Sequence, residues 1–192
     1  MEKKIKYINK IVAESLQFAE AKNAALITFN GAALYAVVEG KEMMPKIIHD
    51  FVPFWSLLLV AAISISLIAF LPIMNPSTST SKREVANRVR LKDNISIFYF
   101  VHIRFFDSES LIKLIYEYYE VKAPAKFKRS ELDLIMQTIV LSRITYRKYL
   151  FFSIAGHLTM ITLIVPIPFL ILYWTSILLK KAIVRKEEKK DE

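Results

Sequence analysis

Few side chains in this sequence are placed for catalysis. The three histidines, His49, His102 and His157, lie in a charged loop, an aromatic segment and an apolar run, without the short spacing of metal ligands. The absence of cysteine excludes disulfides, thiolate metal sites and a cysteine nucleophile. Three widely separated glycines cannot form a glycine-rich phosphate loop. With no paired-carboxylate or nucleophile motif either, we expect no enzymatic activity, no metal and no bound cofactor.

Two basic clusters could instead bind phosphate groups. They are Lys126, Lys128 and Arg129, and then Arg143, Arg147 and Lys148. A nucleotide phosphate is one candidate ligand, because Lys and Arg donate charge-assisted hydrogen bonds to phosphate. Basic residues just cytoplasmic of a membrane span more often bind anionic lipid headgroups, so we favour lipid for the second cluster. The candidate ligand-binding residues are Lys126, Lys128, Arg129 and Arg143. No nucleic-acid-binding motif accompanies the charge, so we expect no nucleic-acid partner.

The elements that carry these residues follow from where charges are missing. The chain has 192 residues, of which 54% are hydrophobic and 23% charged, and a net charge of +9. No Lys, Arg, Asp or Glu occurs in residues 23–38, 51–74 or 149–179. A helix needs about 20 apolar residues to cross a bilayer. We therefore predict an all-α membrane protein, a single membrane domain over residues 1–192, with transmembrane spans at about 24–38, 51–74 and 149–179.

Apolar residues at helical spacing also occur in the charged segments that precede two of these runs. Apolar residues recur in steps of three and four at Ile5, Ile8, Val12, Leu16 and Ala19, and again at Leu132, Ile135, Ile139, Ser142 and Tyr146. Each series predicts a long helix that enters the following span without a break. Between them, Ser110 precedes a predicted helix that Pro124 ends. Residues 94–106 fit either a strand or an aromatic segment at the membrane surface.

The third run is long for one simple crossing and contains the sequence VPIP at residues 165–168. It fits one tilted, proline-kinked helix, or a hairpin that would give four spans. Lys and Arg number 5 in residues 1–23, 2 in 39–50, 14 in 75–148 and 6 in 180–192. Basic segments stay in the cytoplasm. We therefore place the N-terminus and a small basic region, residues 75–148, in the cytoplasm, and we favour three spans.

Polar residues inside the apolar runs carry a second kind of information. Asn30 and His157 would lie at membrane depth, where an unpaired polar group is costly. They could form a polar seam that opens into a pore, or hydrogen bonds that join helices, and we favour the second for Asn30. Glu20 and Lys22 fit a salt bridge or snorkelling at the water–lipid boundary. The small residues of the first helix allow close contact between copies, which suits a homo-oligomer.

Residues 16–37, LQFAEAKNAALITFNGAALYAV, resemble the opening signature of the Pycsar effector family, the membrane effectors called PycTM. The matching positions are Glu20, Lys22, Asn23, Ala24, Phe29, Asn30 and Gly31. The later order is similar too: a strong span ending in LPIMNP, the aromatic NISIFYFVHI, and the YRKY element at Tyr146 to Tyr149 before the last span. Glu20 stands where we would more often expect Asp in that family.

The resemblance implies a role that composition and spacing do not indicate. Such an effector serves bacterial anti-phage defence, in which a pyrimidine nucleotide cyclase makes cCMP or cUMP on infection. The effector binds that cyclic nucleotide as its activating ligand and impairs the inner membrane, where it would be a multi-pass protein. Two other functions fit the residues alone: a small channel or transporter subunit, and a membrane-anchored scaffold without pore activity.

Overall fold

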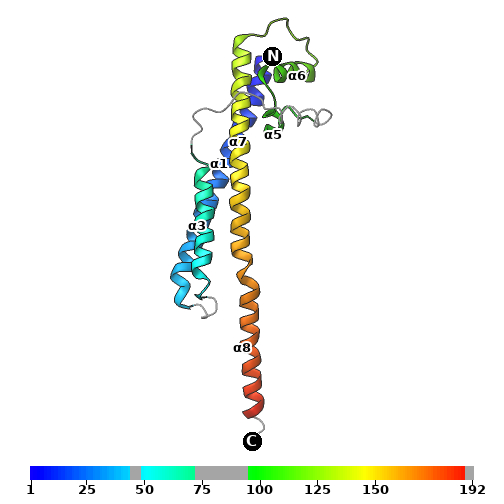
Figure 1. The fold of residues 1–192 in the computed structure, drawn as a ribbon. Coiled ribbons are helices and arrows are strands. Elements are labelled where there is room, and N and C mark those ends of the chain that lie inside the picture. The colour runs from blue at the N-terminus through cyan, green and yellow to red at the C-terminus, as the bar shows by residue number, and fades with distance from the viewer. Residues whose placement is uncertain (44–48, 72–94, 189–192) are drawn as a thin grey trace. The chain divides into compact units, whose positions relative to one another are not determined.

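The computed structural model describes residues 1–43, 49–71 and 95–188, and all the regular structure in these ranges is helical. The four long helices are α1 (Glu2–Glu39), α3 (Val52–Ile68), α7 (Arg129–Ile164) and α8 (Pro166–Glu188) (Figure 1). The short ones are the 3-10 helix η1 (Gly40–Met43), α5 (Phe100–Ile103) and α6 (Ser108–Tyr118). The all-α prediction is confirmed for these residues. Residues 72–94, which include the end of the predicted second span and the start of the predicted cytoplasmic region, lie outside them.

The chain divides into two compact units. Unit 1 comprises Met1–Ala25 and Ser66–Ser153, and unit 2 comprises Leu26–Ile65 and Ile154–Glu192. The core of unit 1 joins the start of α1 to α5, α6 and the start of α7. Its largest fully buried side chains are Ile5, Ile8, Val12, Ile97, Ile103, Leu111, Ile112, Ile115 and Ile135. The predicted apolar face of α1 is thus confirmed, with Leu16 half-buried at its edge.

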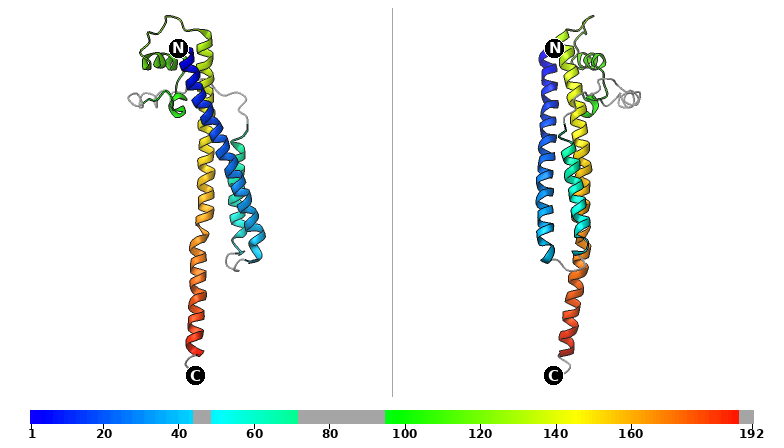
Figure 2. Two further views of the ribbon diagram at one scale, coloured as in Figure 1. Left: turned by 180° about the vertical axis from the view of Figure 1, so that it is seen from behind. Right: turned by 60° about the vertical axis from the view of Figure 1, so that its left-hand side comes forward.

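Within unit 1, α1 and α7 lie side by side and run in the same direction (Figures 1 and 2). The Asn9 side-chain amide donates to the Thr138 hydroxyl at 2.9 Å, and the Asn23 amide donates to the main-chain carbonyl of Lys148 at 3.3 Å. The contacts advance together along both helices, so the pairing is parallel. Ile135, Ile139 and Ser142 are buried on α7, as the periodicity predicts.

Helix α6 has boundaries different from those predicted. It begins two residues before Ser110, because the Asp107 carboxylate accepts hydrogen bonds from the Ser110 main-chain N–H and hydroxyl, both at 2.8 Å, and so caps the helix. It ends well before Pro124. Glu120 adopts a left-handed φ of 52°, and the Val121 N–H donates to the Tyr116 carbonyl at 3.0 Å. These are features of a Schellman motif, which satisfies the last carbonyls without a proline.

The described part of the aromatic segment, residues 95–106, is not a strand. It holds α5, a single helical turn, with tight turns on both sides. Ile97 and Ile103 are buried in the core of unit 1, and the Phe100 ring stacks on Tyr149 of α7 with centroids 5.3 Å apart. The β-branched and aromatic residues that favour a strand by propensity here fill space against α7, since tertiary packing overrides strand propensity.

In unit 2, α7 passes into α8 at Val165 without a hairpin. The Val165 N–H donates to the Ile161 carbonyl at 3.0 Å, and Pro166, which has no N–H, starts α8 in the first helical position. The chain continues in the same direction beyond it (Figure 1). The hairpin alternative for the third run is therefore wrong, and an interrupted helix is what the structure has. The predicted continuation of α7 into the apolar run is confirmed.

One helix in the described part of the chain is long and apolar enough to cross a membrane, the run Arg129–Leu179. Helix α3 is apolar too but shorter, with 17 residues. It packs against the last turns of α1, where Val37 meets the buried Val52 and Trp55. The number of spans stays a prediction.

A buried hydrogen bond between α6 and α7 makes the core of unit 1 sensitive to alkali. The Tyr116 hydroxyl donates to the Glu131 carboxylate, with oxygens 3.2 and 3.4 Å away, and both residues are buried. Burial, and then the charge of Glu131, raise the pKa of Tyr116. A raised pKa means that the fold favours the neutral phenol. The stability that this phenol contributes is therefore complete below about pH 10, and it is lost as the pH rises through the pKa of Tyr116 in the folded state.

We therefore expect Tyr116→Phe to lower the free energy of unfolding by about 1–3 kcal/mol at neutral pH, because the buried Glu131 loses a donor. The same variant should lose less stability above pH ~10 than the wild type, since it has no phenol to ionise there. Denaturant unfolding of the full chain, followed by circular dichroism at both pH values, measures this. Tyr118→Phe, at an exposed tyrosine, is the control. If alkaline pH lowered the free energy of unfolding of Tyr116→Phe as much as that of the wild type, Tyr116 would not be the source of the sensitivity to alkali.

Candidate functional site

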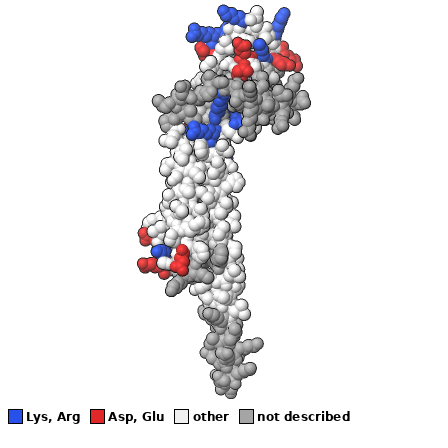
Figure 3. All heavy atoms as spheres, in the orientation of Figure 1, with Lys and Arg blue, Asp and Glu red and all other residues white. Residues whose placement is uncertain are grey.

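The first basic cluster lies on an open surface. Lys126 and Lys128 are exposed in the connection from α6 to α7, and Arg129 is the exposed first residue of α7. Basic side chains, with acidic ones among them, lie around this end of α7 (Figure 3). The three residues are therefore close in the chain and accessible to a ligand, but they line neither of the pockets described below.

Arg143 lies apart from that cluster. It follows Arg129 by 14 residues on α7, which corresponds to about 21 Å along the axis at 1.5 Å per residue. Its Nε donates a hydrogen bond of 3.1 Å to the main-chain carbonyl of Arg104, next to α5. The structure thus brings three of the four candidate ligand-binding residues together and places Arg143 in a structural contact elsewhere.

The motif residues Glu20 and Asn23 both meet α7 at Lys148. The Lys148 ammonium lies 2.7 Å from a Glu20 carboxylate oxygen. One turn further along α1, Asn23 is 1% exposed, and its amide donates to the carbonyls of Ala19 and Lys148 at 3.0 and 3.3 Å. Two residues that the sequence singled out by family resemblance therefore bind one residue 125 or more positions away. The predicted alternatives for Glu20 were a salt bridge and snorkelling, and it forms the salt bridge.

The ammonium of Lys22, the third motif position in this part of α1, lies close to three aromatic rings. It is 4.4 Å from the ring centroid of Phe18 and 5.5 Å from those of Tyr149 and Phe152 on α7. A cation over an aromatic face is attracted by the ring quadrupole. Lys22 therefore contributes a cation–π contact to the α1–α7 pairing, at the position where the charge-free run of α7 begins.

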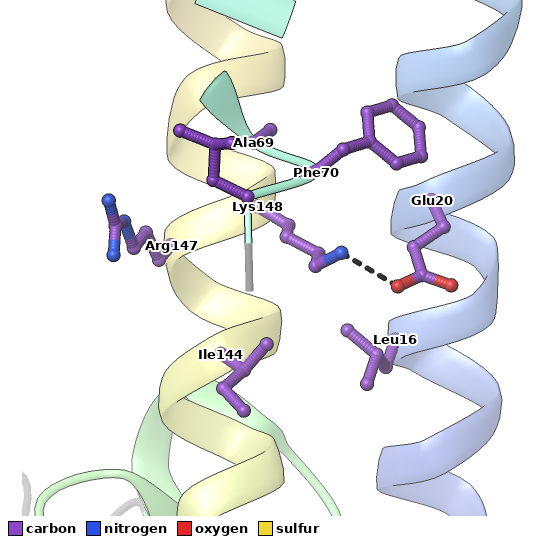
Figure 4. Close-up of a pocket in the computed structure, with 8 residues that line it drawn as sticks. Leu16, Glu20, Ala69, Phe70, Ile144, Arg147 and Lys148 are labelled. Atoms are coloured by element: carbon purple, nitrogen blue, oxygen red, sulfur yellow. Dashed lines mark hydrogen bonds and ion pairs between the residues drawn. The ribbon is translucent and has the colours of Figure 1, made fainter. Parts of the chain in front are cut away.

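A pocket of about 360 Å³ adjoins the Glu20–Lys148 ion pair (Figure 4). α1 contributes Leu16 and Glu20, α7 contributes Ile144, Arg147 and Lys148, and the residues after α3 contribute Ala69, Phe70 and Leu71. Lys148 reaches toward Glu20, whereas Arg147 points away from it (Figure 4). The pocket thus combines two cations and one carboxylate with an apolar wall, a composition that suits an amphiphilic anion.

A second pocket, of about 460 Å³, lies between α5 and α7. Its lining is mostly aromatic and includes Tyr99, Phe100, Tyr146 and Tyr149. Beside it the Arg104 guanidinium lies over the Tyr146 ring, 3.3 Å from the centroid. Sequence reasoning missed both pockets. The density of aromatic residues in 94–106 was a signal for the second, but no sequence feature indicated that residues 69–71 would close the first.

The polar residues of unit 2 differ from one another. Asn30 is fully buried, and its side-chain oxygen accepts a hydrogen bond from the Thr159 hydroxyl of α7 at 3.0 Å. His157 lies on an exposed position of α7. In the described residues no three His, Asp or Glu side chains are grouped so that they could hold a metal ion. The geometry of Asn30 is the one that the interhelical hydrogen-bond interpretation requires.

We expect a double-mutant cycle between Asn30→Ala and Thr159→Val to give a coupling energy of about 0.6–2 kcal/mol, the range for hydrogen bonds between membrane helices. Unfolding in mixed detergent micelles measures it. Thr162→Val is the matched control, because both hydroxyls bond to a carbonyl of their own helix, Thr162 to that of Leu158 and Thr159 to that of Ala155, so the control removes the same local bond. A coupling energy for Thr159 no larger than that for Thr162 would show that this bond does not hold the helices together.

Comparison with known proteins agrees with the motif. The sequence matches the family described as PycTM, Pycsar effector protein domain, over residues 4–176. No curated protein and no solved structure matched it. The match covers most of the chain, from the first turn of α1 into α8, and includes Glu20, Lys22, Asn23 and Asn30. The resemblance read from the sequence is therefore confirmed, and the chain belongs to the Pycsar effector family of anti-phage defence proteins.

Proposed function

We propose that this chain is a multi-pass protein of the bacterial inner membrane that impairs the membrane when a cyclic pyrimidine nucleotide, cCMP or cUMP, is present. The observation that supports it most is the family match over residues 4–176. The nucleotide acts as an activating ligand supplied by a pyrimidine nucleotide cyclase, and the effector needs no catalytic activity of its own.

Exposed apolar surface supports a membrane location. In the third apolar run, Ile161, Leu172 and Trp174 are 54%, 66% and 61% exposed, and only 6% of the most apolar window of this helix is buried. On α3, Leu57 is 64% exposed. Each Å² of such surface left in water costs roughly 25 cal/mol. A bilayer removes that cost, and a helix of this length has the reach to cross it.

The distribution of positive charge supports three spans with the N-terminus inside. Residues 75–148 carry 14 of the 27 Lys and Arg residues, and the loop at 39–50 carries 2. Basic segments remain in the cytoplasm. We therefore place residues 1–23 and 75–148 in the cytoplasm and the 39–50 loop outside. An odd number of spans then puts the C-terminus outside.

We further propose that the effector works as a homo-oligomer, because three helices of one chain cannot enclose an aqueous path. α1 carries small residues at Ala21, Ala24, Ala25, Gly31 and Ala32, of which the alanines are exposed. A Cβ atom added at Gly31 would meet no atom within 4 Å, so there is room for another helix on this face. Small residues permit close helix approach in membranes. The ligand must bind the active packing more tightly than the resting one.

The test of the trigger is leakage from liposomes that contain the purified full-length chain. We expect cCMP or cUMP, but not the purine control cAMP, to release an encapsulated dye at least several-fold faster than no nucleotide. Two samples are run in parallel. One is protein-free liposomes, and the other is liposomes with Asn30→Leu, a variant that removes a buried amide from α1. Leakage that is the same with and without pyrimidine nucleotide would contradict the trigger, and the absence of leakage would favour a scaffold.

The test of the topology uses reporter fusions at Glu192. With three spans, alkaline phosphatase fused there should be active and green fluorescent protein dark, because the first folds only outside the cytoplasm and the second only inside. Fusions at Met1 should give the opposite result. The reverse pattern at Glu192 would show an even number of spans.

A further inference from the structure

Lys148 and Glu20 form an ion pair whose two members are unequally buried. The Lys148 side chain is 12% exposed, whereas that of Glu20 is 44% exposed. A largely buried ammonium needs an anion beside it, because the interior solvates it poorly. The Glu20 carboxylate can turn into water at little cost. Lys148 is thus the fixed partner of this pair, and Glu20 is the replaceable one.

The pocket beside this pair has the charge and size for a small phosphodiester. Arg147, Lys148 and Glu20 give it a formal charge of +1, which one phosphodiester monoanion neutralises. Its volume of about 360 Å³ lies within the range of small-molecule sites. The Phe70 ring centroid is 5.4 Å from the Lys148 ammonium, so an apolar wall stands directly beside the cation.

We propose that this pocket binds a phosphodiester, whose anionic oxygens take the place of Glu20 on Lys148. Arg147 is exposed at the rim, with its guanidinium carbon 5.3 Å from the Phe151 ring centroid, and it supplies the second cation by turning inward. The apolar part of the ligand lies against Leu16, Phe70 and Leu71. At rest, the Glu20 carboxylate occupies the anion position and competes with the ligand.

Two candidate ligands fit this pocket, and both are phosphodiesters with one negative charge. One is the headgroup of an anionic lipid such as phosphatidylglycerol, since Lys148 directly precedes the charge-free run at 149–179. The other is the 3′,5′-cyclic phosphate of cCMP or cUMP, and that part of the proposal rests on the proposed function. In either case the exchange releases Glu20, and with it one link between α1 and α7.

The experiment measures ligand binding to the full-length chain in nanodiscs. Labelled cCMP and cUMP are titrated in phosphatidylcholine nanodiscs, and retained phosphatidylglycerol is quantified by native mass spectrometry. Glu20→Gln should tighten binding by about fivefold, because it removes the competing charge of a half-exposed ion pair. Lys148→Met should weaken binding at least about tenfold, and Lys148→Arg should restore it. Lys113→Met, an exposed lysine of α6, is the control.

The outcomes separate the site from the proposed function. Parallel changes for phosphatidylglycerol alone, for the nucleotides alone, or for both support the pocket and identify its ligand. A merely structural ion pair would make Glu20→Gln less stable without tighter binding, and that result overturns the proposal. If Lys148→Met does not fold, Arg147→Met at the exposed rim must weaken binding severalfold, and unchanged binding there overturns it as well. Nucleotide-triggered leakage that persists unaltered in these variants would exclude the cyclic nucleotide as the ligand of this pocket, while the proposed function stands.

Discussion

The structure depends on one constraint: a polar side chain buried between apolar helices needs a hydrogen-bond partner, and at two positions of α1 that partner lies on the neighbouring helix. In unit 1 the amide N–H of Asn23 donates to the carbonyl of Lys148, and in unit 2 the amide oxygen of Asn30 accepts from the hydroxyl of Thr159. Apolar surface would hold α1 against α7 in many registers. These polar contacts form in one register only, so they select the pairing that apolar packing leaves open.

The elements that could be predicted from the sequence are those set by local patterns. Ile5, Ile8 and Val12 recur at helical spacing and are buried on one face of α1, and Ile135 and Ile139 do the same on α7. The charge-free runs indicate apolar helices, since a missing charge is visible without knowledge of the fold. Asn9, Asn23 and Asn30 are separated by multiples of seven residues, a spacing that already places them on one side of a helix.

What could not be predicted depends on contacts between distant residues or on single backbone conformations. Nothing local pairs Glu20 with Lys148, 128 positions away, or brings Phe70 beside them. The end of α6 is set by Glu120, a residue without the conformational freedom of glycine, so the more visible Pro124 is a misleading signal. In residues 95–106 the strand-forming composition is real, but packing against α7 outweighs it.

The location of the candidate site also follows from the geometry of α7. If the chain works as proposed, a water-soluble ligand has to act on α7 before its charge-free run begins, because such ligands do not enter the hydrocarbon. Lys148 is the last charged residue before that run, and α7 is continuous from Arg129 to Ile164. Lys148, which contacts α1 through Glu20, and Thr159, which contacts α1 through Asn30, therefore both belong to α7. In the proposed function, the Glu20–Lys148 ion pair therefore marks the last position along α7 at which a water-soluble anion can reach a charged side chain of this helix.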